Sequence, residues 1–321
     1  MRIIIYGVGA VGGAAAAALI ENGQEVIGIA RGAQLAAIRT DGLRMRSPQF
    51  DKVVQFECVS DPAEIAFHAD DMILLCMKTQ DTPPALEALR AAGVNEQPVF
   101  CLQNGVENER MALRVFPNVH GVTVMLPAGL HGPGQAVAYC EPKFGMFDIG
   151  RYLGGHDADD ARLAKSFEGS MIEPFVQDDV MASKYGKLLL NLSNITQAAL
   201  GRGVETEEIG EALREEALAA YEANGIAWMN LGKGDPRRDR FMNFGTVPGI
   251  DNAGGSTLQS LARGAGSVET DYLNGEIALL GRMAGVPTPV NAAMVRLGAK
   301  LAREGAAPAS MTLDDLRRFV G

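Results

Sequence analysis

Three glycines near the N-terminus, Gly7, Gly9 and Gly12, form the pattern GxGxxG and constrain the fold more than any other feature. The apolar run at 2–6 (RIIIY) precedes them as an expected buried strand, and an alanine-rich expected helix at 14–23 follows. In such a strand–turn–helix the first glycine permits the tight turn, the second lets the backbone approach a pyrophosphate, and the third allows close helix–strand packing. The pattern predicts a dinucleotide-binding loop with the contact residues Gly7, Val8, Gly9, Ala10, Val11 and Gly12.

The first 178 residues alternate between strand-like and helix-like segments. Helix-like sequence such as PPALEALRAAG (83–93) separates apolar runs, and between 130 and 175 short β-like pieces follow Gly/Pro turns. The alternation predicts a doubly wound parallel sheet, an α/β Rossmann-type domain over residues 1–178, which the 130–175 region would complete in antiparallel fashion. After the first strand, the expected strands are 24–30, 53–59, 71–78, 98–103 and 120–128.

Residues 179–321 consist largely of helix-like segments, which predict an all-α second domain. The stretch 181–201 is expected to form one long helix that ends at its final glycine, and Thr206 is the expected N-cap of the next one. Residues 231–266 are rich in Gly, Pro and Arg without periodicity, which predicts a long loop of functional or mobile character. The domain is expected to bind substrate, and its apolar helix faces would either pack in its own core or form a homodimer interface. The further expected helices are 206–230, 267–285 and 288–305.

The charge balance argues against several classes of partner. The chain has 29 Lys+Arg against 39 Asp+Glu, a formal charge of −10, whereas nucleic-acid binding draws its affinity from basic residues that neutralise phosphates. Nucleic acids and anionic membranes are therefore not expected as partners, and no run of 18 apolar residues indicates a membrane span. The apolar N-terminal stretch superficially has the layout of a signal peptide, but its glycine spacing favours the nucleotide loop. We expect a soluble cytoplasmic protein.

Cysteine and histidine usage argues against a metal centre. The four cysteines are widely spaced without a CxxC pair, and none of the four histidines lies four residues from another. Three of the cysteines lie in or beside apolar runs, so buried free thiols are expected, which fits a reducing compartment. No metal is predicted. The cysteines are Cys58, Cys76, Cys101 and Cys140.

The residue after the second expected strand distinguishes the two nicotinamide dinucleotides. NAD-specific sites place Asp or Glu about 20 residues after the glycine motif, where the carboxylate holds the ribose hydroxyls. This chain has Arg31 there, and a guanidinium would bind a 2′-phosphate through charge-assisted hydrogen bonds. The position predicts NADP(H) as the cofactor, with a solvated surface arginine as the alternative.

Other polar residues stand in places suited to chemistry. Lys78 ends one expected strand and Asn104 directly follows another, at the edge where α/β sheets bind ligands. Lys187 and Asn191 are four residues apart and so share one face of an expected helix. Glu269 stands near the start of another helix. Taken singly, a lysine or glutamate in such a place is ordinarily a solvated surface charge.

These segments follow one another in an order that resembles one family over most of the chain. GVGAVG (7–12), Arg31, LQNGVEN (102–108), KYGKLLLN (184–191) and ETDYLNGE (269–276) resemble the ketopantoate reductase (2-dehydropantoate 2-reductase) family. The resemblance implies an N-terminal Rossmann domain, a helical C-terminal domain and an active site in the cleft between them. It also implies reduction of 2-dehydropantoate to pantoate by NADPH, in the pantothenate pathway.

The same resemblance assigns roles to individual residues. Lys187 matches the catalytic lysine, Glu269 the active-site glutamate and Lys78 a lysine that lines the cofactor cleft. Asn104 matches an asparagine at the nicotinamide. The implied substrate-binding residues are Asn104, Asn191, Ser256 and, with a departure from the family pattern, Asn194.

The chemistry needs groups of these types. Hydride addition to a ketone places negative charge on the oxygen, which must be stabilised and protonated, and an ammonium such as that of Lys187 can do both. Glu269 would orient that ammonium or hydrogen-bond the product hydroxyl. Asparagine amides can hold a substrate carboxylate without adding a charge of their own.

One departure concerns the residues that would contact the substrate. The family helix reads K-x-x-x-N-x-x-x-N, but the position eight residues after Lys187 holds Ile195, with Asn194 one residue earlier. On a continuous helix one residue is a turn of about 100°, so Asn194 would not simply replace the second asparagine. The resemblance therefore favours reduction of a 2-oxo acid over 2-dehydropantoate specifically. The alternatives are a relative that acts on another oxo or hydroxy acid, as a reductase or a dehydrogenase, and a non-catalytic NADP(H) sensor.

Overall fold

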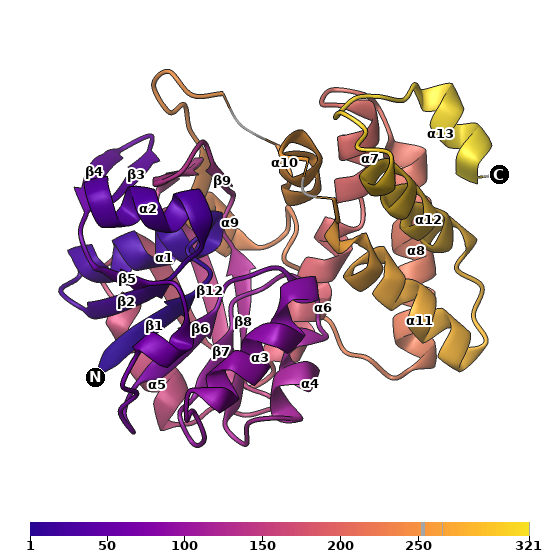
Figure 1. Ribbon diagram of the computed structural model, residues 1–321. Coiled ribbons are helices and arrows are strands. Elements are labelled where there is room, and N and C mark those ends of the chain that lie inside the picture. The colour runs from indigo at the N-terminus through magenta and orange to yellow at the C-terminus, as the bar shows by residue number, and fades with distance from the viewer. Residues whose placement is uncertain (252–253, 265, 321) are drawn as a thin grey trace. The chain divides into compact units, whose positions relative to one another are not determined.

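The computed structural model describes residues 1–251, 254–264 and 266–320 (Figure 1). Contacts between residues divide the chain into two compact units. The first comprises Met1–Gln103, Glu107–Lys184 and Leu231–Asn252, and the second comprises Asn104–Val106, Tyr185–Asn230 and Ala253–Gly321.

This division differs from the single boundary expected between residues 178 and 179. The chain crosses between the units more than once, because residues 104–106 belong to the second unit and residues 231–252 return to the first. The helix at Val180–Asn191 starts in the first unit and leaves it after Lys184. One boundary between residues 178 and 179 therefore cannot separate the two units, because the chain returns to the first unit after leaving it.

The first unit is built on a sheet whose described strands follow the order β13-β12-β8-β7-β6-β1-β2-β5. Neighbouring strands pair in parallel except β8 and β12, which are antiparallel. From β1 the sheet grows to β2 and β5 on one side and to β6 and β7 on the other. This order confirms the doubly wound α/β fold and its antiparallel completion. The strands are β1 (Arg2–Tyr6), β2 (Glu25–Ile29), β5 (Glu57–Val59), β6 (Met72–Leu75), β7 (Val99–Cys101), β8 (Val119–Met125), β12 (Gly145–Arg151) and β13 (Ile172–Val176).

Alternate residues of β1 face opposite layers, which is why this strand is apolar throughout. Ile3 and Ile5 pack in one core, whereas Ile4 and Tyr6 pack in the other. Helices contribute to both cores, so the sheet is covered on both faces. The first core includes α1 (Ala10–Glu21), α2 (Gly32–Asp41) and α5 (Ala158–Phe167), and the second includes α3 (Thr82–Ala91) and α4 (Asn108–Leu113); the short 3-10 helices are η1 (Pro62–Glu64) and η2 (Thr79–Asp81).

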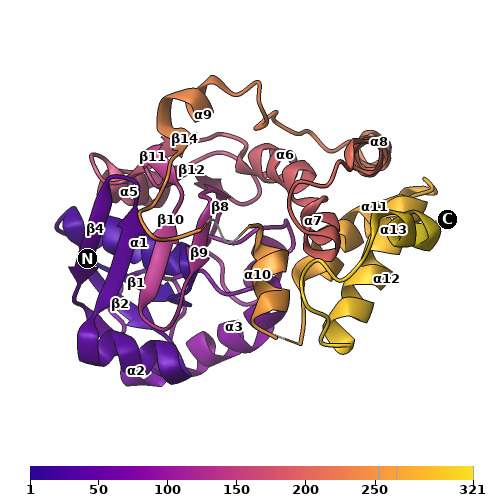
Figure 2. The same ribbon diagram turned by 90° about the horizontal axis from the view of Figure 1, so that it is seen from above.

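Helix α1 is buried from Gly12 to Leu19. It packs against β1 and β2 and also against a second sheet of order β4-β3-β10-β9 (Figure 2). The side chains of residues 14–18 are 0% exposed, and all of them are alanine. Methyl side chains let the helix pack closely against both sheets, which accounts for the alanine run. The strands of the second sheet are β3 (Leu43–Ser47), β4 (Phe50–Val54), β9 (Ala128–Leu130) and β10 (Gln135–Ala138).

Two expected segments fold differently. The expected strand at 53–59 is divided between two strands of different sheets, since β4 ends at Val54 and β5 begins at Glu57. The expected loop at 231–266 contains regular structure, and its strand pairs with a strand far away in the sequence. Local periodicity cannot indicate pairing of that kind. The elements are α9 (Pro236–Phe241), β14 (Met242–Phe244), its partner β11 (Cys140–Pro142), and α10 (Ser256–Ala262).

The second unit is helical, as predicted. Its helix α12 packs against α7, α8, α11 and α13 (Figure 1). Among the described residues, no helix combines the length and the apolar character that crossing a membrane requires. The elements are α6 (Val180–Asn191), which starts in the first unit, α7 (Asn194–Leu200), α8 (Glu207–Ala223), η3 (Glu269–Tyr272), α11 (Asn274–Ala284), α12 (Pro289–Arg303) and α13 (Leu313–Val320).

The single helix expected at 181–201 is interrupted. α6 ends at Asn191 and α7 begins at Asn194, so Leu192 and Ser193 form a turn. The carbonyl oxygen of Leu192 accepts a hydrogen bond from Nδ2 of Asn274 at 3.0 Å. A buried carbonyl without a partner would cost about 1–3 kcal/mol, so a residue distant in sequence stabilises this interruption.

Candidate active site

The glycine loop lies between the carboxyl ends of β1 and β6, where the strand order of the sheet reverses. Gly7 has a φ of +101°, and a Cβ there would lie 2.8 Å from the backbone nitrogen of Met77. A Cβ on Gly12 would lie 2.2 Å from the oxygen of Gly7. Around Gly9, by contrast, no described atom other than those of Gly9 and its two chain neighbours lies within 4 Å of the Cβ position. The three glycines thus provide the turn, the open approach and the close packing that the pattern predicted.

The loop leads directly into the N-terminus of α1. Gly9 is the N-cap, and the first turn of the helix contains no acidic residue. Unpaired N–H groups and the partial positive charge at a helix N-terminus suit a pyrophosphate. Val8 is 2% exposed and anchors the loop in the core, whereas Ala10 and Val11 are partly exposed. The geometry fits the dinucleotide that the sequence predicted.

A glutamine that carries no sequence signal holds this loop. Gln34 lies in α2, and its Nε2 donates to the carbonyl oxygen of Val8 at 2.8 Å. Its Oε1 accepts from the backbone N–H of Gly134 at 2.8 Å. One side chain therefore ties the glycine loop to the turn before β10.

Two basic side chains border the loop. Arg31 is the exposed N-cap residue of α2, and the first turn of that helix contains no acidic residue. Lys78 is partly exposed and directly follows Met77, whose backbone packs against Gly7. The strands β2 and β6 that precede these residues are the two neighbours of β1. The sheet therefore brings Arg31, Lys78 and the glycine loop to one edge, and this donor set fits NADP(H).

The remaining residues singled out in the sequence belong to the second unit. Lys187 and Asn191 lie on successive turns of α6, where Lys187 is partly exposed and Asn191 is 5% exposed. The amide oxygen of Asn191 is buried and has no hydrogen-bond partner among the described residues. Because such an atom costs about 1–3 kcal/mol, a ligand that donates a hydrogen bond would fit here.

The turn between α6 and α7 changes the direction of Asn194. Its Oδ1 lies 3.4 Å from the position of a Cβ on Gly255, the residue before α10. The N–H of Gly255 donates to Oε1 of Gln197 at 2.8 Å, which holds this end of α10 against α7. Ile195, by contrast, is 1% exposed and lies in the core. The expectation that Asn194 is offset by 100° on a continuous helix was therefore wrong, because the helix is not continuous.

Ser256, Glu269 and Asn104 lie in the same unit. Ser256 opens α10, and its buried hydroxyl has no hydrogen-bond partner among the described residues. Glu269 opens η3 and is 6% exposed. Asn104 precedes Gly105, whose φ is +80° and whose Cβ would lie 3.1 Å from the carbonyl oxygen of Tyr272 at the end of η3. Asn104 was expected in the first domain, but its segment lies beside η3 in the second unit.

Comparisons with known proteins match both parts of the chain. The family model described as ketopantoate reductase PanE/ApbA matches residues 3–148, and the model of its C-terminal domain matches residues 179–302. The chain belongs to the ketopantoate reductase family.

Individual relatives of this ketopantoate reductase family member agree. A Mesorhizobium japonicum protein named 2-dehydropantoate 2-reductase is 28% identical over 95% of this chain and 98% of its own length. The crystal structure of a PanE/ApbA family ketopantoate reductase from Ralstonia eutropha JMP134 is 30% identical, has a TM-score of 0.78, and the match covers 95% of this chain and 99% of that one. A D-mandelate dehydrogenase solved with NADH and anilino(oxo)acetate shares the fold at 22% identity and a TM-score of 0.76, over 95% of this chain and 99% of that one.

In this ketopantoate reductase family member the residues singled out in the sequence fall into two sets. The glycine loop, Arg31 and Lys78 belong to the first unit. The second set shares the second unit and is supported there by a buried polar network, in which Asn274 donates to Asn291 at 3.1 Å and Asn291 donates to Glu216 at 2.8 Å. That set consists of Asn104, Lys187, Asn191, Asn194, Ser256 and Glu269.

Asn274 is a residue whose importance the sequence hid. It is 1% exposed and joins the turn after α6 to this network, since it also donates to Leu192. Asn274 lies inside the ETDYLNGE stretch, in which the sequence analysis assigned a function only to Glu269. Its contacts become visible only once the start of α11 is known to lie beside the turn that follows α6.

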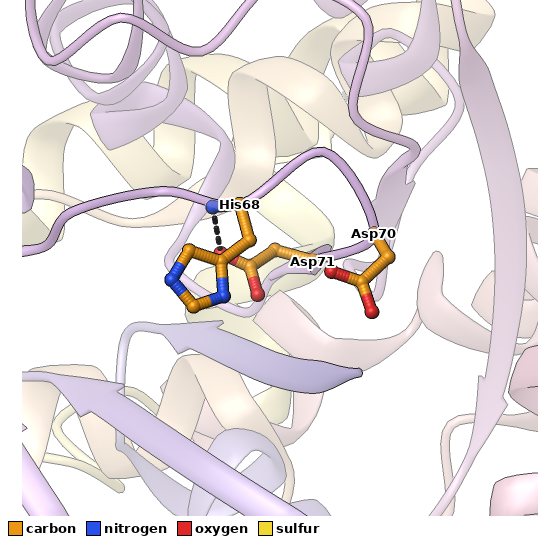
Figure 3. Close-up of side chains that lie close together, drawn as sticks. All are labelled: His68, Asp70 and Asp71. Atoms are coloured by element: carbon orange, nitrogen blue, oxygen red, sulfur yellow. Dashed lines mark hydrogen bonds between the residues drawn. The ribbon is translucent and has the colours of Figure 1, made fainter.

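One histidine–carboxylate cluster lies just before β6 and consists of His68, Asp70 and Asp71 (Figure 3). The buried carboxylate of Asp71 accepts from the backbone N–H of His68 at 2.7 Å, which is the dashed line in Figure 3. The guanidinium of Arg2 donates to both of its oxygens, at 3.0 and 2.6 Å. The carboxylate charge is therefore already balanced by the protein, and we assign no metal to this cluster.

A second cluster, His120 with Asp157 and Asp160, is a hydrogen-bonded network in the same unit. Nδ1 of His120 lies 2.7 Å from Asp160 Oδ1, and its Nε2 lies 3.0 Å from Asn118 Oδ1. Both ring nitrogens are engaged within the protein, so this cluster also receives no metal. That the protein needs no metal stays a prediction.

The cysteines are free thiols. Cys58, Cys101 and Cys140 are buried, as expected, whereas Cys76 is partly exposed. Burial raises the pKa of Cys58 to about 11 and that of Cys140 to about 12. These thiols are therefore protonated at neutral pH and poor nucleophiles, which agrees with a packing role.

Proposed function

We propose that this family member reduces 2-dehydropantoate to pantoate with NADPH. The observation that carries the proposal is the pair of unpartnered buried atoms, Asn191 Oδ1 and Ser256 Oγ, in the same unit as Lys187. An amide oxygen accepts a hydrogen bond, and a hydroxyl donates or accepts one. A small hydroxylated 2-oxo acid offers a hydroxyl donor and carboxylate acceptors, which are the partners these atoms lack. Relatives named 2-dehydropantoate 2-reductase support this choice of acid.

The first unit binds the cofactor. NADPH, when bound, supplies the hydride that adds to the substrate carbonyl carbon. The N–H groups of the glycine loop and of the start of α1 bind the pyrophosphate, and the exposed guanidinium of Arg31 binds the 2′-phosphate. Lys78 adds positive charge beside the loop. Gln34 and the packing of Gly12 on Gly7 hold the loop in shape before the cofactor arrives.

Lys187 provides the electrophilic and acidic group. Its ammonium donates a hydrogen bond to the substrate carbonyl oxygen, stabilises the negative charge that develops there, and then transfers a proton to give the hydroxyl. Glu269 opens η3, where its carboxylate orients the ammonium or accepts from the product hydroxyl. The family resemblance assigns Asn104, beside η3, to the nicotinamide.

Three side chains bind the rest of the substrate. Asn191 Oδ1 accepts from a substrate hydroxyl, and the hydroxyl of Ser256 donates to the carboxylate. Asn194 lies against Gly255, the residue before Ser256. It replaces the second asparagine of the family pattern K-x-x-x-N-x-x-x-N as a substrate-binding residue. The turn at Leu192 and Ser193 is what makes this possible, since it brings an asparagine from a different helical position to the start of α10.

The substrate is tested by following NADPH absorbance with a panel of 2-oxo acids that includes 2-dehydropantoate. We expect turnover of 2-dehydropantoate with a kcat/KM above ~10⁴ M⁻¹s⁻¹. Activity restricted to another oxo acid, or to oxidation of a hydroxy acid, would move the assignment to that compound. Tight NADPH binding without turnover of any acid would identify a sensor instead.

The role of Lys187 is tested by Lys187→Ala. We expect kcat to fall by roughly 10²–10⁴ with a nearly unchanged Kd for NADPH. Lys165→Ala, which removes an exposed lysine from α5, is the control and should keep the kcat of the unmodified protein. A Lys187→Ala variant with full kcat would remove this residue from the mechanism.

The role of Arg31 is tested by Arg31→Asp. A carboxylate would repel the 2′-phosphate, so the KM for NADPH should rise far more than that for NADH. Equal effects on the two cofactors would contradict the assignment.

The free cysteines support a reducing compartment such as the cytoplasm. The homodimer stays a prediction.

A further inference from the structure

Lys184 and Glu109 form an ion pair that is almost entirely buried. Their side chains are 2% and 0% exposed, and the Lys184 ammonium also donates to the carbonyl oxygen of Cys101 at 3.3 Å. The second carboxylate oxygen of Glu109 is buried and has no hydrogen-bond partner among the described residues. Burial raises the pKa of this carboxyl, and the ammonium opposes the rise. Apolar side chains of similar volume often stabilise a core at least as well, so stability alone does not account for the pair.

The sheet beneath the pair lacks side chains at two facing positions. Gly121 of β8 and Gly150 of β12 are partners in the antiparallel register. A Cβ on Gly121 would lie 3.0 Å from Val180 and 3.5 Å from atoms of both ion-pair members. A Cβ on Gly150 would lie 3.0 Å from Val180. The first turns of α6 therefore pack directly on the strand backbone, and the ion pair lies beside this close approach.

A second polar contact holds the same end of the helix. Ser183 donates to Asp148 of β12, and this carboxylate also accepts from Gln177 and Arg237. Successive residues differ by about 100° around a helix axis. Because Ser183 contacts β12 while Lys184 contacts α4 and β7, the two side chains together define both the rotation and the axial position of α6.

This anchored end lies one turn before Lys187. α6 passes into the second unit immediately after Lys184, and Lys187 follows about 4.5 Å further along the helix axis. The carbonyl that Lys184 contacts belongs to Cys101, the last residue of β7, three residues before Asn104. The ion pair thus lies just before two segments that contain proposed site residues, the part of α6 with Lys187 and the loop after β7 with Asn104.

We propose that the Lys184–Glu109 pair is a positioning element of the reductase, which holds α6 in one rotation and axial position so that Lys187 presents its ammonium to the substrate carbonyl. The inference rests on the proposed function, in which Lys187 is the proton donor. Neither Lys184 nor Glu109 is proposed to contact the substrate. Both act through the helix they anchor.

Variants of the full chain test the proposal through kcat, KM for 2-dehydropantoate, Kd for NADPH and Tm. Glu109→Gln keeps the shape of the side chain and removes its charge, and the double variant Lys184→Met/Glu109→Leu replaces the pair by apolar side chains. We expect kcat to fall roughly 10–100-fold in both, with a much smaller change in Kd for NADPH, since the glycine loop that binds the pyrophosphate follows a different strand, β1. The control Arg162→Met breaks the partly exposed Arg162–Asp159 pair of α5 and should keep the unmodified kcat.

The same double replacement in a Lys187→Ala background separates positioning from general distortion. If the pair acts through Lys187, its replacement should not lower the residual rate further once Lys187 is gone. A general structural effect would instead lower the rate by the same factor in both backgrounds.

Several outcomes would overturn the proposal. A folded double variant with unmodified kcat would do so, as would equal losses in the two backgrounds. If the double variant does not fold, Glu109→Gln with unmodified kcat leads to the same conclusion. In each of these cases the proposed function stands, provided that Lys187→Ala shows its expected loss of kcat. A fully active Lys187→Ala variant would contradict the proposed role of Lys187, and this inference with it.

Discussion

Replacing Gly12 by alanine should weaken cofactor binding, whereas the same change at the adjacent Gly13 should not. Both glycines lie near the start of α1, so both alanines gain about 1 kcal/mol of helix propensity. A Cβ on Gly12 would lie 2.2 Å from the oxygen of Gly7, but for Gly13 the nearest atom is the Cβ of Ala136 at 3.2 Å. Only the first contact involves the backbone of the nucleotide loop.

The size of the effect follows from these contacts. Real Cβ atoms essentially never approach a neighbour within 3.0 Å, so the Gly7 carbonyl must move by about 0.8 Å to admit the new methyl group. Overpacking of this kind typically costs about 1–3 kcal/mol. After the gain in helix propensity, the free energy of unfolding should fall by about 0–2 kcal/mol. We expect the displaced loop to lose about tenfold in NADPH affinity, about 1.4 kcal/mol.

Two measurements on the protein without cofactor check this reasoning. Denaturant unfolding gives the free energy of unfolding, and a titration of NADPH fluorescence gives its Kd. Gly13→Ala should unfold at the same or a higher denaturant concentration and keep Kd within about threefold. If Gly12→Ala binds NADPH as tightly as the unmodified protein, the packing of Gly12 on Gly7 does not determine the shape of the loop.

Three further predictions concern stability and thiol chemistry. Gly186→Ala would place a Cβ 1.8 Å from the carbonyl oxygen of Met229; a variant with unchanged Tm would contradict the expected loss of about 1–3 kcal/mol. Asn274→Ala leaves the Leu192 carbonyl unpaired, which should cost about 1–3 kcal/mol and raise the KM for the oxo acid, as unfolding curves and kinetics would show. Because burial raises the pKa of Cys58 to about 11, its alkylation, followed by mass spectrometry, should be slow at pH 8, accelerate up to about pH 11, and be fast at pH 8 only after unfolding.

The features that were predictable from the sequence are those that neighbouring residues determine. Gly7, Gly9 and Gly12 have the turn, the opening and the packing expected of them, because each role depends on a few bonds of local backbone. The strand–helix alternation likewise predicted the doubly wound sheet. A buried parallel strand must be apolar on both faces, and β1 shows this in its own five residues.

The features that could not be predicted depend on residues far apart in the chain. The sequence from Lys187 to Leu200 has the pattern of one helix, and its interruption depends on Asn274. Nothing in the sequence around Lys184 indicates a buried ion pair, because its partner Glu109 lies on a different element. Asn104 was assigned to the domain that contains its strand, yet the loop that carries it contacts η3. No window of local sequence contains both members of any of these pairs.

The enclosure of α1 between two sheets has a consequence for the energetics of cofactor capture. A helix whose alanines at 14–18 are shielded on every side should be among the slowest segments in hydrogen–deuterium exchange. Its N-terminal amides then keep one orientation whether or not a phosphate is present. Because those amides lose little motion on binding, the entropic penalty of association is small on this side of the ligand. The alanine run thus makes the anion receptor rigid before any anion arrives.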